Sequence, residues 1–147
     1  MAADNQNDHI FSNKILFFFT RDVEMVIVVI IFEGMVFSAG LYARKDVKGT
    51  KNAEATQCMC DAGAILLATT NTSELAMWWE SHNYVHGRSK NPYDTSRIVG
   101  GSSGGEGAVL AAAASPMGLG SDIGGSIRMP AFFNGIFGHK PSKCELF

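Results

Sequence analysis

Two glycine-rich loops carry the serines whose types and spacing could do chemistry. The first loop, Gly100–Gly105, contains Ser102 and Ser103, and the second, Gly120–Ser126, ends on Ser126. Glycine is favoured where the backbone turns tightly or where its N–H groups must approach a ligand closely. A serine hydroxyl in such a loop suits attack on a carbonyl, because nearby backbone N–H groups can bind the oxyanion that forms. We therefore expect the two loops to form the wall of an active site.

Other motifs for reactive loops fit these residues less well. A P-loop needs a lysine followed by serine or threonine after its glycines, and neither loop has one; the dinucleotide pattern G-x-G-x-x-G is also missing. The nucleophile elbow G-x-S-x-G occurs around Ser102 and around Ser103, and Asp122 and His139 follow in the chain order of that triad. They follow too closely for that fold, so we expect neither nucleotide binding nor an elbow-type triad.

The histidines and cysteines do not form a metal-binding pattern. His82 and His86 are four residues apart, but the glutamate of the zinc motif H-E-x-x-H is missing between them. Cys58 and Cys60 have no second pair at zinc spacing. We expect surface or hydrogen-bonded histidines, reduced cysteines, and neither a metal nor a cofactor.

The composition describes a globular chain without a strong net charge. Of the 147 residues 46% are hydrophobic, which is enough for one core, and the net charge of −2 gives no electrostatic basis for binding nucleic acid. The N-terminus lacks the basic residues of a signal peptide, and the apolar runs Ile15–Phe19 and Met25–Phe32 are too short to span a bilayer. We expect a cytoplasmic protein or one on the surface of an intracellular membrane, with Ile15–Phe19 as the candidate peripheral contact.

Strands and helices that alternate along the chain are expected to position the two loops. Short β-branched or apolar runs predict strands, and segments of good helix formers predict helices, with Ser73 as an N-cap and the exposed turn Ser89–Arg97 between them. Pro130 is expected to close a turn over Ser126–Met129, and Trp78 and Trp79 to pack in the core and at its rim. This order predicts an α/β fold with a mixed, mostly parallel sheet and helices on both faces. The strands are Met25–Phe32, Ala64–Thr69, Met117–Gly120 and Ile136–His139, and the helices are Asn52–Ala62, Glu74–Glu80 and Glu106–Ser115.

The stretch from Gly100 to Pro130, taken as a whole, resembles the amidase signature family. It reads G-G-S-S-G-G-E-G, then an alanine-rich segment, then G-S-D-I-G-G-S-I-R-x-P. Flanking segments resemble the fatty-acid amide hydrolase branch of that family, particularly its second vertebrate-type and insect relatives: Thr70–Leu75, Tyr84–Asp94 and Met129–Ser142. The resemblance runs from about Glu33 to Ser142 and implies a partial amidase-signature fold.

The resemblance implies a Ser–Ser–Lys triad. The nucleophile of the family corresponds to Ser126, and the bridging serine, 24 residues earlier, corresponds to Ser102. The peptide bond of the bridging serine is cis in the family. Asp122 and Arg128 match fixed positions that brace the loop, and the oxyanion donors correspond to the backbone N–H groups of Ile123, Gly124, Gly125 and Ser126.

The lysine of that triad has no counterpart here. The family's spacing leads back from Ser102 to Ile27, and alignment through Glu33–Gly40 leads to the same residue. Isoleucine cannot accept a proton, and a serine hydroxyl is a weak nucleophile without a base. We therefore expect little amidase activity from this chain.

The resemblance implies hydrolysis of a small-molecule lipid amide without cofactor or metal. Members of the family are several times longer, so we expect a truncated chain: an incomplete amidase-signature domain over residues 33–147, preceded by a weakly matched segment, 1–32. A non-catalytic remnant that binds a lipid or a partner is the alternative. The amidotransferase component that makes glutaminyl-tRNA shares the signature, but Met129–Ser142 favours the hydrolase branch. The acyl chain, the amine and the oligomeric state stay open.

Overall fold

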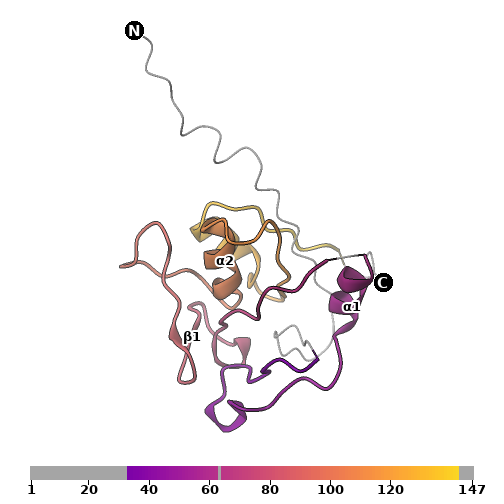
Figure 1. Cartoon of the computed structure of the whole chain (residues 1–147). Helices are drawn as coiled ribbons and strands as arrows, with labels where there is room; N and C mark the ends of the chain where they lie inside the picture. The colour runs from indigo at the N-terminus through magenta and orange to yellow at the C-terminus, as the bar shows by residue number, and fades with distance from the viewer. Residues whose placement is uncertain (1–32, 63, 143–147) are drawn as a thin grey trace.

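The computed structural model of the chain describes residues 33–62 and 64–142, which form short helices joined by long irregular segments (Figure 1). The strand predicted at Met25–Phe32, the membrane contact at Ile15–Phe19 and the position of Ile27 lie outside the described residues. In chain order the elements are the 3₁₀-helix η1 (Tyr42–Arg44), α1 (Glu54–Asp61), the 3₁₀-helix η2 (Glu74–Ala76), β1 (His82–Asn83), β2 (Gly87–Arg88), α2 (Gly104–Ala111) and α3 (Arg128–Phe133).

Two of the predicted helices are present, with shifted ends. The helix predicted over Asn52–Ala62 is α1, with Glu54 in its first turn, where a carboxylate interacts favourably with the helix dipole. The helix predicted over Glu106–Ser115 is α2, which begins two residues earlier, inside the first glycine loop. It ends at Ala111, and the left-handed backbone of Ala113, with φ of 58°, prevents its continuation toward Ser115.

Helix α3 was not predicted. Pro130 lies in the first turn of α3 instead of closing a turn over Ser126–Met129, so that expectation is wrong. The first residues of a helix have no intrahelical acceptor for their N–H groups, and the N–H that proline lacks is therefore not needed there. The helix begins at Arg128, with Ile127 as its N-cap, and thereby fixes the end of the second glycine loop.

The helix predicted over Glu74–Glu80 is wrong. Only the single turn η2 forms, and within it Leu75 and Ala76 have left-handed backbone, with φ of 51° and 58°. The hydroxyl of Ser73, expected to cap a helix, instead lies 2.8 Å from the carbonyl oxygens of both Trp78 and Glu80 and holds the chain in a loop.

The two tryptophans of that loop are exposed, so the expectation that they pack in a core is also wrong. Trp78 is 67% exposed and Trp79 is 73% exposed. Their rings stack on each other with centroids 6.5 Å apart. The segment forms a loop in place of the predicted helix, and this loop leaves both side chains on the surface.

The mostly parallel sheet with helices on both faces is not confirmed. The described residues form one two-stranded antiparallel sheet, in which His82 pairs with Arg88 and Asn83 with Gly87. The buried side chain of Asn83 shapes the turn between these strands by accepting the N–H groups of Val85 and His86 at 3.0 and 2.8 Å. Three predicted strands are wrong for this part of the chain, since none of them pairs with a neighbour there and a strand requires a ladder partner: Ala64–Thr69, Met117–Gly120 and Ile136–His139.

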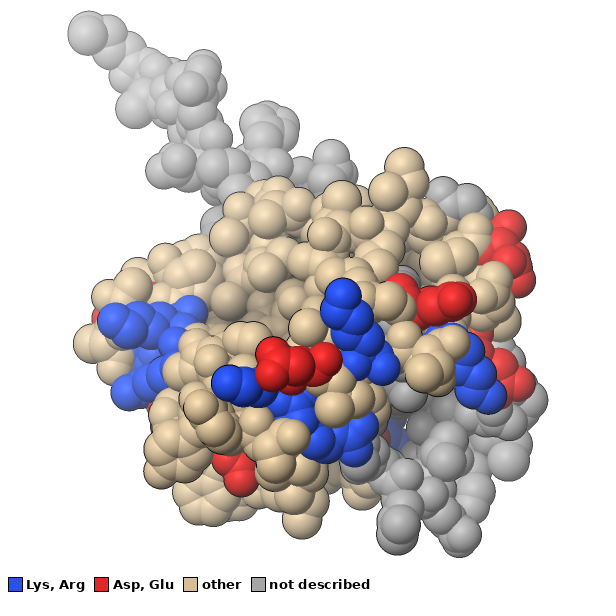
Figure 2. Space-filling view, turned by 60° about the horizontal axis from the view of Figure 1, so that its bottom comes forward, with Lys and Arg blue, Asp and Glu red and all other residues tan. Residues whose placement is uncertain are grey.

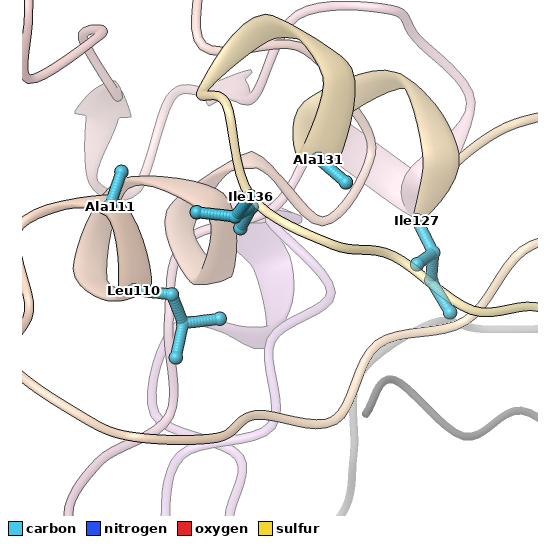
Figure 3. Packing of buried hydrophobic residues seen from close by; sticks show 5 residues of the cluster. All are labelled: Leu110, Ala111, Ile127, Ala131 and Ile136. Atoms are coloured by element: carbon cyan, nitrogen blue, oxygen red, sulfur yellow. The ribbon is translucent and has the colours of Figure 1, made fainter. Parts of the chain in front are cut away.

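A small apolar core lies behind the two glycine loops. Figure 3 shows its five buried side chains, which come from α2, from α3 and its N-cap, and from the segment that follows α3. They are Leu110, Ala111, Ile127, Ala131 and Ile136, with Met117 packed against them. Since α2 begins inside the first loop and α3 begins two residues after the second, this core determines where both loops lie.

The surface of the described part carries charges of both signs. Figure 2 shows basic and acidic side chains interspersed on one face. Some of the charged residues are paired: Nε of Arg97 lies 2.9 Å from Oδ2 of Asp94. His82 and His86 are exposed, which confirms their predicted surface position. None of the helices in the described residues is long and apolar enough to cross a membrane.

Candidate active site

The two glycine loops lie against each other. The N–H of Ser103 in the first loop donates to the carbonyl of Ser126 in the second at 3.1 Å. The N–H of Ser121 approaches the hydroxyl of Ser103 at 3.5 Å. The structure therefore brings the backbones of Ser102 and Ser126 into one site, although 24 residues separate them in the sequence.

Ser102 lies at the centre of the first loop and is fully buried. Its peptide bond with Gly101 is cis, which confirms the expectation drawn from the family. Its carbonyl oxygen accepts the hydroxyl of Thr72 at 2.9 Å and the N–H of Ser73 at 3.3 Å, and the hydroxyl of Ser81 lies 3.0 Å away. Its backbone is therefore held by several groups.

The hydroxyl of Ser102, by contrast, has no hydrogen-bond partner among the described residues. Buried side-chain oxygens are almost always hydrogen-bonded, and an unpaired one costs about 1–3 kcal/mol. Because no structural hydrogen bond uses this hydroxyl, its capacity to donate and to accept a proton is free for a reaction. The two hydrogen-bonded serine loops and this hydroxyl are the features that a reaction could use.

Glycines in the first loop are required by close contacts. A Cβ on Gly101 would lie 2.5 Å from the carbonyl oxygen of Trp78, and one on Gly104 would lie 2.5 Å from Cγ1 of Val99 and even closer to the hydroxyl of Ser81. Real Cβ atoms do not approach other atoms this closely. The repeated glycines of G-G-S-S-G-G thus let neighbouring segments pack directly on the loop backbone.

Asp122 organises the second loop. Its buried carboxylate accepts the N–H groups of Gly125, Ile127 and Arg128 at 2.7, 3.1 and 3.1 Å. The guanidinium of Arg128 donates two further hydrogen bonds to it, both 2.9 Å long. Burial opposes ionisation of this carboxyl, but the hydrogen bonds from Arg128 and from the backbone outweigh it and lower the pKa of Asp122 to about 2. The carboxylate is therefore ionised at neutral pH and bends the chain around Ser126.

The turn that Asp122 forms leaves backbone N–H groups open beside Ser126. Within the described residues, the N–H groups of Ile123, Gly124 and Ser126 take part in no hydrogen bond, whereas that of Gly125 is bound to Asp122. Ser126 itself is half-buried, and Ile123 and Gly124 are exposed. Open N–H groups of this kind can bind a negatively charged oxygen.

Glu106 is a further buried acidic group near the first loop that the sequence patterns did not single out as functional. Burial raises its pKa, although the hydroxyl of Thr70 donates to it at 2.7 Å and the N–H of Leu119 also donates to it. Its carboxyl lines a cavity of about 660 Å³ between α1, the segment from Ala64 to Thr72, and residues 114–120. Ser103 reaches this cavity, but Ser102 and Ser126 do not line it. Glu106 is therefore a residue of α2 that forms part of the cavity wall.

Several residues that hold the first loop were missed in the sequence: Asn71, Thr72, Ser81 and Asn83. All are polar, and Thr72, Ser81 and Asn83 are buried. The amide of Asn83 donates to Oδ1 of Asn71 at 2.6 Å and to the carbonyl of Thr72 at 2.8 Å. For Asn71 and Thr72 the sequence offered only a run of small polar residues, Thr69–Ser73, which by itself predicts a loop.

No three His, Cys, Asp or Glu side chains in the described part of the chain are grouped so as to hold a metal ion. Cys58 and Cys60 are free thiols on α1. The candidate site consists of serine hydroxyls, backbone N–H groups and a charged brace. Such a set can carry out acyl transfer once a proton acceptor is supplied.

The chain is similar to known proteins over most of its length. Residues 29–146 match the family model described as Amidase. The chain is 63% identical over 110 residues to human fatty-acid amide hydrolase 2, a match that covers 75% of this chain and 21% of the relative. It is 47% identical over 91 residues to a glutamyl-tRNA(Gln) amidotransferase component of Methanosarcina acetivorans, a match that covers 62% of this chain and 19% of that protein.

The fold of the chain is similar to that of a solved hydrolase structure. The structure of 6-aminohexanoate cyclic dimer hydrolase complexed with substrate superimposes with a TM-score of 0.64 and 32% sequence identity, covering 79% of this chain and 23% of the hydrolase. The chain spans about a fifth of the length of the curated relatives that it matches.

Proposed function

The chain belongs to the amidase family, and from this membership we propose that it hydrolyses a carboxamide by attack of Ser126 on the amide carbon. The Ser126 oxygen forms a bond to the carbonyl carbon, and the proton of its hydroxyl passes through Ser102 to the nitrogen of the leaving amine as the C–N bond breaks. Water then attacks the acyl ester on Ser126, releases the carboxylic acid and restores the hydroxyl.

One observation carries this proposal. The hydroxyl of Ser102 is fully buried and has no partner among the described residues, in a loop whose next residue is hydrogen-bonded to the carbonyl of Ser126. A hydroxyl that relays a proton needs donor and acceptor capacity that no structural hydrogen bond uses. The Ser102 hydroxyl can both donate and accept a hydrogen bond, and its loop lies against the loop that carries Ser126.

The oxyanion is assigned to backbone N–H groups of the second loop. Of the four that the family suggests, Ile123, Gly124 and Ser126 have an N–H without another acceptor in the described part, while the N–H of Gly125 bonds Asp122. Loss of one oxyanion donor costs about 10²–10³ in rate in well-studied hydrolases. We assign the main contribution to the three open groups, and a bracing role to Gly125 through Asp122.

Ile27 is expected to make the reaction slow. We assign it to the position of the family's lysine, and it lies outside the described residues. A positioned general base contributes about 10²–10⁴ in rate, and isoleucine cannot provide it. We therefore propose a reactive but poorly activated Ser126.

The substrate class we propose is a fatty-acid amide. The basis is the 63% identity to human fatty-acid amide hydrolase 2 over most of this chain, compared with 47% to the amidotransferase component over a shorter stretch. A fatty-acid amide is a small-molecule amide, the kind of substrate that membership of the amidase family suggests. A non-catalytic protein that binds a lipid or a partner is the second candidate, and the expected loss of the base, with Ile27 assigned to the lysine position, favours it.

A fluorophosphonate probe distinguishes the two candidates, because it forms a covalent bond only with an activated serine. The whole chain should be labelled slowly at Ser126, as located by mass spectrometry, and Ser126→Ala should abolish the label. Ser115→Ala is the matched control, since the Ser115 hydroxyl donates to the carbonyl of Met117, outside both loops. Folded chain that takes no label, or label that persists in Ser126→Ala, would overturn the proposed function.

A further inference from the structure

We propose that Ser81 is a positioning residue that fixes the backbone around Ser102, an inference that rests on the proposed role of Ser102. Ser81 is fully buried. Its hydroxyl oxygen lies 3.0 Å from the carbonyl oxygen of Gly100 and 3.0 Å from that of Ser102, and it accepts the N–H of Gly104 at 2.8 Å. One side chain thus contacts the first loop before, at and after the bridging serine.

This contact matters because the Ser102 side chain is oriented only through its backbone. Its hydroxyl makes no hydrogen bond within the described residues, so its position depends on the backbone that carries it. Thr72 adds one hydrogen bond to the same carbonyl at 2.9 Å, but only Ser81 also reaches Gly100 and Gly104. A displacement of about 1 Å in a reacting group can cost roughly 10²-fold in rate.

Ser81 is itself held firmly by its own backbone. It directly precedes β1, and its carbonyl accepts the N–H of Ser89 at 2.9 Å, just beyond the end of β2. The amide of Asn71 approaches the same carbonyl at 3.4 Å. The β1–β2 hairpin, which carries none of the reacting groups, therefore serves as the support from which the Ser81 hydroxyl reaches the loop.

The test compares two buried serines whose hydroxyls each accept a backbone N–H. Ser81→Ala removes the contact with the loop, whereas Ser38→Ala removes a hydroxyl that accepts the N–H of Gly40 at 3.1 Å, a bond that involves no residue of either serine loop. Both variants should lower the midpoint of thermal unfolding. Only Ser81→Ala should also lower the second-order rate constant of fluorophosphonate labelling, by about 10- to 100-fold. Equal labelling of the two variants would overturn the inference.

Amide hydrogen exchange of Ser103 provides a readout that does not depend on reactivity. This N–H bonds the carbonyl of Ser126, so its protection reports whether the two loops stay together. It should exchange about tenfold faster in Ser81→Ala and at the wild-type rate in Ser38→Ala. If the wild-type chain is not labelled, the proposed function fails, and exchange alone then decides the role of Ser81.

A second substitution covers the case in which Ser81→Ala does not fold. Ser81→Cys keeps the side chain's bulk but replaces the hydroxyl with a weakly hydrogen-bonding thiol. It should change labelling and Ser103 exchange in the same direction as Ser81→Ala. Wild-type values of both in folded Ser81→Cys would contradict the proposal.

Discussion

Replacing Asp122 by asparagine removes the charge that organises the second glycine loop and leaves the side-chain shape unchanged. Oδ1 accepts the N–H of Gly125 and one guanidinium N–H of Arg128, and Oδ2 accepts the N–H groups of Ile127 and Arg128 and a second guanidinium N–H. Whichever way the amide turns, its NH₂ group replaces an oxygen that accepts at least two hydrogen bonds. Asp122→Asn therefore leaves at least two donors unpaired in a buried place.

The structure sets the size of the effect. A carboxyl whose pKa falls from 3.8 to about 2 on folding contributes about 2 kcal/mol to the free energy of unfolding at neutral pH. Unpaired buried donors add to the loss, since each costs roughly 1–3 kcal/mol. We expect Asp122→Asn to lower the free energy of unfolding by at least about 4 kcal/mol at pH 7, about 2 from the charge and at least about 1 from each of two donors, which is a large share of the total stability of a small domain.

The sign of the pH dependence follows from the lowered pKa. The unfolded chain binds the proton more tightly than the folded chain, so the contribution is complete above the unfolded pKa of 3.8 and is lost as the pH falls through about 2. The wild-type protein should lose about 2 kcal/mol over this interval through Asp122, and the variant should not. The difference between the two proteins should therefore shrink by about 2 kcal/mol toward the acidic end, which leaves the cost of the unpaired donors.

Urea unfolding of both proteins, followed by circular dichroism at a series of pH values, measures this difference. Asp94→Asn is the control, because Asp94 is an exposed carboxylate paired with Arg97, and its loss should change stability little. Parallel pH profiles for wild type and Asp122→Asn would refute the reasoning, since they would show that the carboxylate is not selectively stabilised in the folded chain.

Two further predictions concern neighbouring parts of the site. Gly104→Ala should lower the free energy of unfolding by at least about 2 kcal/mol, because its Cβ would lie 2.5 Å from Cγ1 of Val99. Gly124→Ala should change the free energy of unfolding by less than about 0.5 kcal/mol, because its Cβ would have nothing within 4 Å. Chemical denaturation of both variants tests this contrast, and equal losses of stability would contradict it. Burial raises the pKa of Glu106, so the folded chain binds this proton more tightly and stability should fall as the pH rises above 4.5. Glu106→Gln should flatten that fall, and an unchanged pH profile in the variant would show that the carboxyl is not desolvated in the folded chain.

The local chemistry of the loops could be predicted from the sequence. Glycines around Ser102 and Ser126 indicated tight backbone contacts, and the contacts of Gly101 and Gly104 have this character. The turn at Ser89–Arg97 also forms as its residues predict, since Asn91 accepts the N–H of Tyr93 at 2.9 Å and Asp94 that of Ser96 at 3.0 Å. Such features depend on residues close together in the sequence.

The elements that depend on distant partners could not be predicted in the same way. Ala64–Thr69 has the composition of a strand, but no neighbour pairs with it in the described part, and Ile65 is 85% exposed. Glu74–Glu80 consists of good helix formers, but the hydroxyl of Ser73 binds two carbonyls of the same segment and holds it as a loop. Ser81 was missed for the same reason, because its partners are about 20 residues further along the chain.

The most direct test of the central claim, that Ser126 is in place but lacks a base, is substitution at position 27. Ile27→Lys should raise the second-order rate constant of fluorophosphonate labelling at Ser126 by about 10²–10⁴, the usual contribution of a general base. Ile27→Met, which has similar size and no charge, should leave the rate unchanged. An Ile27→Lys protein that is folded but reacts no faster than the wild type, or an equal rise in Ile27→Met, would contradict the account.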